Sequence, residues 1–151
     1  MLRLSKKMAY ALEAVVDIAY HGGAEPVQSR DITKRQDIPQ RYLEQVMQRL
    51  VHAGILKGVR GPRGGYRLAR ERRRITVADV ADVVYDLEAG DDIIERETPS
   101  ILAEKVVRPI WRDLRKDMMK HLQTISVEDL CIQAKSQDIP SELQKLTDFS
   151  I

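Results

Sequence analysis

Residues 29–70 read SRDITKRQDIPQRYLEQVMQRLVHAGILKGVRGPRGGYRLAR, and this stretch decides the fold. It predicts two short helices joined by a tight turn and followed by a glycine-rich hairpin that carries arginines. Ser29 is expected to cap the first helix, because its side-chain oxygen is able to accept a hydrogen bond from an unpaired N–H of the first turn. Asp37, Ile38 and Pro39 then interrupt the helical pattern, since proline lacks an N–H and fits best at the start of the next helix.

The second helix is expected over about residues 39–53. Apolar residues recur at three- and four-residue steps and form a stripe that must pack inward: Leu43, Val46, Met47 and Leu50. The other face is polar, with Gln40, Arg41, Glu44, Gln45 and Gln48. Glutamine and arginine are suited to base edges in a major groove, where they form bidentate hydrogen bonds. A plain solvated helix surface has the same composition, so the residues that follow the helix decide between the two interpretations.

A hairpin is expected directly after this helix. Gly54 ends the helix, residues 57–60 form a strand, residues 61–65 form a glycine- and proline-containing turn, and residues 66–69 return as a second strand. Residues 57–74 hold eight basic side chains and one acidic side chain. A helix pair followed by a basic hairpin is typical of a winged helix-turn-helix, with one helix in the major groove and the wing against phosphates or the minor groove. The alternative is a nucleotide-binding loop, which is disfavoured because the Gly-Lys-Ser/Thr ending is absent and no helix opens directly after the glycines.

The charge of the chain is divided between its two halves, although the net charge is only +2. Residues 1–74 carry 16 basic and 7 acidic side chains, whereas residues 75–151 carry 9 basic and 16 acidic side chains. A basic half with the winged motif and an acidic half held away from phosphate fit a DNA-binding regulator. The single cysteine fits a reducing cytoplasm, and no apolar run reaches the length of a membrane span, so we expect a cytoplasmic protein without a membrane partner.

Three motifs resemble the Rrf-two family of bacterial regulators: LRLSK at residues 2–6, YLEQ at 42–45 and VRGPRGGYRLA at 59–69. The resemblance extends over about residues 2–130, and the family includes the iron–sulfur cluster biogenesis regulator, the nitric-oxide-sensing repressor and the cysteine-metabolism repressor. It implies a dimeric winged-helix transcription factor. Many relatives bind an iron–sulfur cluster through three cysteines after the DNA-binding part. Here residues 86–109 contain no cysteine and no histidine, so neither a cluster nor another cofactor or metal is expected.

Helices are also expected on both sides of the central stretch. The first should run over about residues 5–20, and Thr76 with Asp79 resembles a capping box that opens another helix to about residue 87. After Pro109, residues 110–124 form the longest amphipathic helix, with an apolar stripe that packs either on a second subunit, which we favour, or on its own chain. This stripe consists of Ile110, Leu114, Met118 and Leu122.

A last short helix should open at Ser126 and carry Cys131. We expect Cys131 to be a small buried residue; the alternative is a redox switch near the dimer interface. The tail that follows is polar, and either partly disordered or helical over residues 141–146.

These features predict a mainly α fold with a small β-hairpin wing: a winged helix-turn-helix domain plus a long C-terminal dimerisation helix. The expected division is a DNA-binding domain over residues 1–87, an acidic linker over 88–100, dimerisation helices over 101–132 and a polar tail over 133–151.

The expected function is sequence-specific binding of double-stranded DNA, by a homodimeric repressor on a palindromic operator. The alternative is a winged-helix interaction module whose DNA binding depends on a partner protein, and an unknown small-molecule or protein effector fits either. No catalytic constellation appears at a plausible spacing, so an enzyme is not expected. The expected DNA contacts are Gln40, Arg41, Tyr42, Glu44, Gln45, Arg60, Arg63, Gly64 and Gly65.

Overall fold

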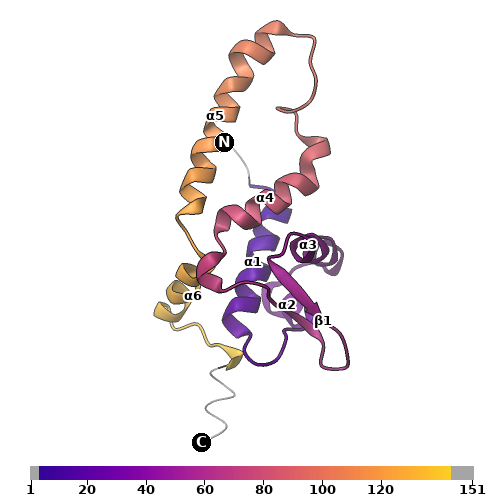
Figure 1. Cartoon of the computed structure of the whole chain (residues 1–151), viewed down its shortest axis with the longest axis vertical. Coiled ribbons are helices and arrows are strands. Elements are labelled where there is room, and N and C mark those ends of the chain that lie inside the picture. The colour runs from indigo at the N-terminus through magenta and orange to yellow at the C-terminus, as the bar shows by residue number, and fades with distance from the viewer. Residues whose placement is uncertain (1–3, 144–151) are drawn as a thin grey trace, which may run out of the picture.

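The structure, a computed structural model, describes residues 4–143 and is mainly helical, with a two-stranded antiparallel hairpin (Figure 1). The α-helices are α1 (Lys6–His21), α2 (Ser29–Gln36), α3 (Gln40–His52), α4 (Val77–Glu88), α5 (Arg108–Gln123) and α6 (Val127–Ser136). The strands are β1 (Leu56–Val59) and β2 (Gly65–Leu68). Short 3-10 turns lie at Arg72–Arg74 and Ala89–Asp91. The predicted mainly α fold with a small β-hairpin is confirmed, and the use of the long C-terminal helix in dimerisation stays a prediction.

Helix α1 is the centre of the molecule, because α2, α3, α4, α6 and β2 all pack against it. Ser5 caps its N-terminus by accepting a hydrogen bond from the Met8 N–H at 3.1 Å. Its Val15 and Ile18 are buried in one core with side chains from the surrounding helices. In Figure 1, α5 projects beyond this body, and the loop that joins it to α4 lies at the far end of the projection. Among residues 4–143, no helix combines the length and the apolar composition needed to cross a membrane.

The start of α2 differs from the expectation. Ser29 is the first residue of the helix, Gln28 occupies the cap position, and no side chain caps the N-terminus. The prediction for Ser29 is wrong because a contact distant in sequence overrides the local preference. Val27 forms an antiparallel bridge with Tyr66, with both backbone N–H···O distances at 2.8 Å, so the chain stays extended up to Gln28.

The turn between α2 and α3 has the expected composition. Asp37 adopts a left-handed conformation (φ 52°) and ends α2, and Pro39 is the cap of α3. The predicted apolar stripe of α3 is confirmed, since four of its side chains are almost completely buried: Leu43, Val46, Met47 and Leu50.

Helices α4 and α6 begin side by side. Thr76 and Asp79 form a complete capping box at α4, as predicted, and Ser126 and Asp129 form a second one at α6. The residues before the two helices pair as an antiparallel bridge between Thr76 and Ser126. This bridge holds the start of α6 beside the start of α4 although 50 residues separate Thr76 from Ser126 in the sequence.

The helix that contains α5 starts earlier than predicted. It begins at Ile101, passes through a π-helical turn at Ala103–Val107, and continues as α5 with Pro109 near its start. Pro109 is therefore not the boundary that the sequence pattern predicts. Proline has no N–H to donate and its ring clashes with the carbonyl four residues earlier, and the wider π turn accommodates both effects without ending the helix.

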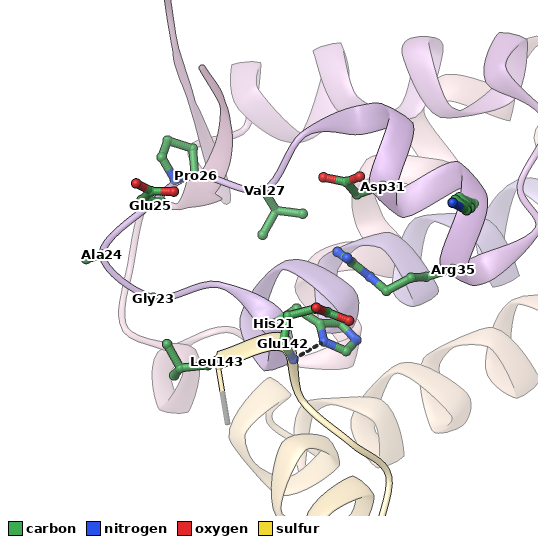
Figure 2. Close-up of a pocket in the computed structure, with 11 residues that line it drawn as sticks. His21, Gly23, Ala24, Glu25, Pro26, Val27, Asp31, Arg35, Glu142 and Leu143 are labelled. Carbon is green, nitrogen blue, oxygen red and sulfur yellow. Dashed lines mark hydrogen bonds between the residues drawn. The ribbon is translucent and has the colours of Figure 1, made fainter. Parts of the chain in front are cut away.

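Helix α6 extends to Ser136, beyond residue 132, which was expected to end the helical part. The segment after it returns to the end of α1 (Figure 2). The Ser141 hydroxyl donates to the Tyr20 carbonyl at 3.0 Å, and the Glu142 N–H donates to His21 Nδ1 at 3.1 Å. Most of the helix expected over residues 141–146 lies outside the described residues.

Candidate nucleic-acid interface

The polar face of α3 is exposed along its length, because its apolar face lies on α1 and α4. The Gln40 amide donates to the Glu44 carboxylate at 3.1 Å, so these two side chains are aligned one turn apart. The exposed residues include all those expected to hydrogen-bond with bases except Tyr42: Gln40, Arg41, Glu44 and Gln45, with Gln48 beside them.

Tyr42 differs from its neighbours because its ring is half-buried. It lies against the ring of Tyr10 of α1, with the ring centroids 5.9 Å apart, and the Arg41 guanidinium lies over the Tyr42 ring at 5.4 Å from its centroid. Tyr42 therefore links α3 to α1 and supports Arg41. Its role as a direct DNA contact stays a prediction.

The wing is a short hairpin in which Leu56 pairs with Leu68 and Val59 pairs with Gly65. Its two adjacent glycines are required by close approach within the chain itself. A Cβ atom at Gly64 would lie 2.3 Å from the Val59 carbonyl oxygen, and one at Gly65 would lie 2.3 Å from the Val27 carbonyl oxygen. The structure thus gives these glycines an intramolecular reason, and their predicted contact with DNA stays a prediction.

Two arginines of the wing are exposed, so that DNA phosphates are able to reach them. Arg60 is exposed, and the Arg63 side chain is 87% exposed at the tip. Arg63 lies 3.7 Å from the carboxylate of Glu25, which is also largely exposed, and such surface pairs contribute little. Helix α3 packs against β1, and Figure 1 shows α3 beside the hairpin.

The basic residues after the wing have a different environment. Arg70 lies 3.8 Å from Asp79 of α4, and Arg72 lies 3.8 Å from Glu128 of α6. In the basic run of residues 57–74, Arg70 and Arg72 therefore differ from the wing arginines because they pair with acids of α4 and α6.

Arg30 was missed by the sequence analysis. It is exposed, and it lines a cleft between the start of α2 and the turn of the wing. The bridge between Val27 and Tyr66 brings these segments together, and no local sequence pattern predicts that bridge.

The apolar stripe of α5 is not covered by its own chain. Ile110 is 60% exposed, Leu114 is 43% exposed and Met118 is 38% exposed, whereas Leu122 is half-buried. Trp111 flanks the stripe and is 41% exposed. A row of large apolar side chains on one helix is unusual at a free surface and is typical of an interface with another molecule.

Residues 4–133 match the profile of the Rrf2 family, which is described as an iron-dependent transcriptional regulator. The chain belongs to the Rrf2 family. The HTH-type transcriptional regulator IscR of Xenorhabdus nematophila is 36% identical over 138 residues, which is 91% of this chain and 82% of the relative. The protein rrf2 of Nitratidesulfovibrio vulgaris is 34% identical over 131 residues, with 85% of this chain and 87% of the relative covered.

Solved structures of Rrf2-type regulators agree with this assignment. IscR of T. potens superposes with a TM-score of 0.71 at 31% identity and covers 95% of this chain and 96% of its own. CymR of B. subtilis, described as the global cysteine regulator, gives a TM-score of 0.66 at 28% identity over 88% of this chain and 98% of its own. This Rrf2 protein is a DNA-binding transcriptional regulator with a winged-helix fold, and because its relatives are transcriptional regulators it is not an enzyme.

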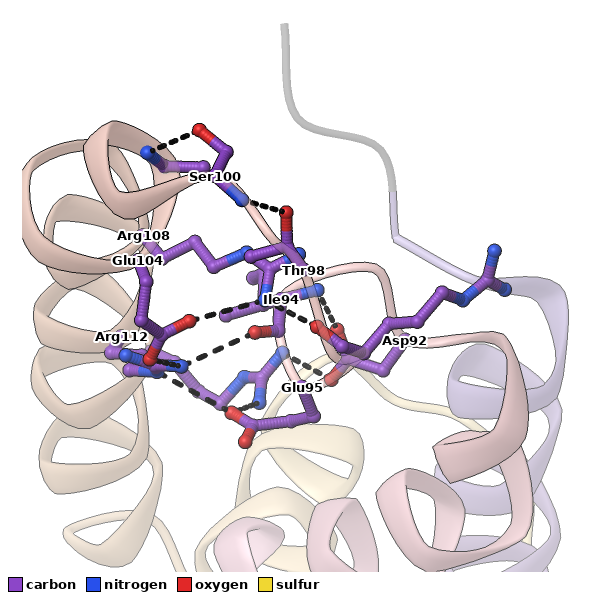
Figure 3. Close-up of polar contacts among 11 residues, drawn as sticks. Asp92, Ile94, Glu95, Thr98, Ser100, Glu104, Arg108 and Arg112 are labelled. Atoms are coloured by element: carbon purple, nitrogen blue, oxygen red, sulfur yellow. Dashed lines mark hydrogen bonds and ion pairs between the residues drawn. The ribbon is translucent and has the colours of Figure 1, made fainter.

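The loop before α5 is where the resemblance would place a cluster, and its residues do not fit one. Residues 86–109 lack cysteine and histidine. The loop carboxylates contact arginines of α5 instead (Figure 3). Arg115 lies 2.6 Å from Asp92, and Arg112 lies 3.9 Å from Glu95 of the loop and 2.9 Å from Glu104 of the π-helical turn. Within residues 4–143, no three His, Cys, Asp or Glu side chains are arranged to hold a metal ion. The iron dependence in the family description therefore has no donor set in this loop.

Cys131 of α6 is 3% exposed, as the sequence analysis expected. Burial raises the pKa of its thiol above the ordinary value, although the nearby Arg72 acts in the opposite direction. A thiol of this kind is mostly protonated at neutral pH and is a poor nucleophile. This environment supports a packing role; the redox alternative stays a prediction.

Proposed function

We propose that this Rrf2 regulator is a homodimeric repressor that binds a palindromic operator without an iron–sulfur cluster. The observation that carries the proposal is that α3, with an exposed polar face, packs against β1 of a wing that has two exposed arginines. The exposed face of α3 offers amide, carboxylate and guanidinium groups for bases, and the adjacent wing offers two arginines for phosphates. A regulator of this kind acts on the chromosome in the bacterial cytoplasm.

The two surfaces divide the task of recognition. Gln40, Arg41, Glu44 and Gln45 lie along the face that would enter the major groove, where hydrogen bonds to base edges carry sequence information. Arg60 and Arg63 would lie along the backbone or in the minor groove. Gly64 and Gly65 set the shape of the wing, and Tyr42 supports Arg41. A direct contact of these three residues with DNA stays a prediction.

Dimerisation would use the α5 stripe. A surface row formed by Ile110, Leu114 and Met118 is self-complementary when two copies of the helix meet about a two-fold axis. Two α3 helices related by that axis would read two half-sites in inverted orientation, which is the geometry of a palindromic operator. Repression follows when a dimer on such a site occludes a promoter.

The experiment is selection of bound duplexes from a random-sequence DNA library with the purified chain and no other protein. We expect a single consensus that forms an inverted repeat with half-sites about one helical turn apart. A consensus without inverted symmetry would contradict the dimer, and the absence of any enrichment would contradict sequence-specific binding by the chain alone and favour dependence on a partner protein.

A further inference from the structure

A buried carboxylate connects α1 with the end of α2. The Asp17 side chain has no exposed surface and lies among the apolar residues of α1. Three hydrogen bonds from two successive residues of α2 reach it. Arg35 donates through Nε at 2.9 Å and through Nη2 at 2.8 Å, and Gln36 donates through its side-chain amide at 2.8 Å.

The same carboxylate is connected to the C-terminal segment through His21. The Nε2 atom of His21 lies 3.9 Å from the Asp17 carboxylate, and its Nδ1 atom accepts the hydrogen bond of the Glu142 N–H. Figure 2 shows Arg35 reaching from α2 toward His21 and Glu142, beside a cleft that opens to solvent. Elements α1, α2 and the end of the described chain therefore meet at one group.

Stability alone does not explain a charge pair in this place. The desolvation of a buried ion pair offsets much of its attraction, and apolar replacements of such pairs are often as stable as the original. A forked guanidinium–carboxylate contact supplies directional geometry, because two parallel hydrogen bonds fix both the distance and the rotation of the partners.

The contact of Asp17 with Arg35 and Gln36 lies at the last turn of α2, directly before α3. Gln36 is the last residue of α2, Asp37 is the left-handed residue that follows it, and α3 begins three residues later at Gln40. A change in the direction of the last turn of α2 would therefore move the start of α3. Hydrogen bonding to base edges tolerates displacements of only about 0.5 Å, so a modest shift would remove base contacts while the wing still reached phosphates.

We propose that Asp17 is a positioning residue for sequence recognition, acting through Arg35 and Gln36 to set the orientation in which α3 meets DNA. The proposal rests on the function proposed above and adds a residue that touches no DNA. It assigns to Asp17 an effect on discrimination between sequences that is separate from its effect on folding.

The test compares binding of each variant to the selected duplex and to a scrambled duplex of the same composition, together with its melting temperature. The variants are Asp17→Asn, which keeps the shape and removes the charge, and Arg35→Lys, which keeps the charge and removes the fork. Glu13→Gln is the matched control, because Glu13 is an exposed carboxylate on the same helix with no hydrogen bond or ion pair to α2 within residues 4–143.

The specificity ratio is the dissociation constant for the scrambled duplex divided by that for the selected duplex. We expect this ratio to fall by about tenfold or more in both variants, which corresponds to the loss of a good base contact. Affinity for the scrambled duplex should stay within about twofold of wild type, since phosphate contacts dominate it. The control should keep the wild-type ratio. If Asp17→Asn does not fold, Arg35→Lys and the milder Gln36→Met, which leaves the ion pair in place, decide the question.

An unchanged ratio in folded Arg35→Lys and Gln36→Met would overturn the proposal. So would an equal loss of affinity for both duplexes, because a purely structural role lowers all binding with the folded fraction. A wild-type chain without preference for the selected duplex would instead refute the proposed function, and the two failures are thereby distinguishable.

Discussion

Gln45 is exposed on the polar face of α3, and its only competing role is that of a solvated side chain. If it hydrogen-bonds with a base, Gln45→Ala should weaken binding to the selected duplex by about 1–3 kcal/mol and relax the preference at one or two positions of each half-site. The measurement is titration against duplexes with single base changes. Gln133→Ala, which removes an exposed glutamine from α6, is the matched control. A Gln45→Ala protein with the wild-type pattern of preferences would exclude this residue from base recognition.

Arg63 is expected to contribute to DNA binding by neutralising phosphate charge and not by recognising bases. Arg63→Ala should weaken binding to selected and scrambled duplexes alike, and the slope of log K against log salt should fall by about one for each phosphate that the variant no longer neutralises. Arg73→Ala is the control, because Arg73 pairs with Glu71 beyond the hairpin. If the salt slope of Arg63→Ala equalled that of wild type, the wing would not touch the DNA backbone.

At the scale of elements, α5 has two faces with different partners. Its apolar stripe is exposed, whereas its arginines face the loop before it. Leu114→Asp would bury an unpaired charge in the proposed interface, which costs several kcal/mol unless the subunits separate. We expect a monomer in sedimentation and loss of binding to the palindrome. Gln123→Asp introduces the same carboxylate at an exposed position on the opposite side of α5, and this variant should remain dimeric. A dimeric Leu114→Asp protein would place the interface elsewhere.

The arginine face of α5 should hold the loop through ion pairs. Arg115 contacts Asp92, whose carboxylate also accepts a hydrogen bond from the Ile94 N–H at 2.9 Å. Arg115→Ala should therefore speed hydrogen exchange of the Ile94 amide, while Lys116→Ala, at an exposed neighbour, should not. Unchanged exchange in Arg115→Ala would show that the loop is held by other contacts.

A second ion pair, between Arg112 of α5 and Glu104 of the π-helical turn before it, should depend on pH in a defined direction. The hydrogen bond from Arg112 lowers the pKa of Glu104 below its ordinary value, so the pair contributes fully above the ordinary glutamate pKa. The contribution is lost as the pH falls through this lowered pKa. Protection of the amides around Glu104, corrected for intrinsic exchange, should decline on acidification below the ordinary glutamate pKa and should be constant at neutral pH.

At the scale of the whole molecule, local signals were readable from the sequence and distant contacts were not. The stripe of α3 and the capping box of Thr76 and Asp79 are patterns of three and four residues, and both are present. Ser29 does not cap α2, because a bridge from Val27 to the distant Tyr66 keeps the chain extended up to Gln28. Pro109 failed as a boundary because a π turn absorbs it.

The candidate interface shows the same division. The exposed side chains of α3 and the wing arginines follow from periodicity and turn composition. Arg30 lies near the wing only because the fold brings the start of α2 to the turn of the hairpin. Arg70 and Arg72 belong to the basic run in the sequence, but in the structure they pair with acids of α4 and α6. Asp17 looks like an ordinary polar residue of an amphipathic helix, and its burial depends on donors from α2 that lie 18 and 19 residues away in the sequence.

The central claim, that two copies of this chain read one DNA site, is tested most directly by the mass and salt dependence of the wild-type complex with the selected duplex in analytical ultracentrifugation. We predict two chains per duplex, with affinity that falls steeply as salt rises and exceeds that for the scrambled duplex by about a thousandfold or more. One chain per duplex would contradict the dimer, and equal affinity for both duplexes would contradict sequence-specific recognition.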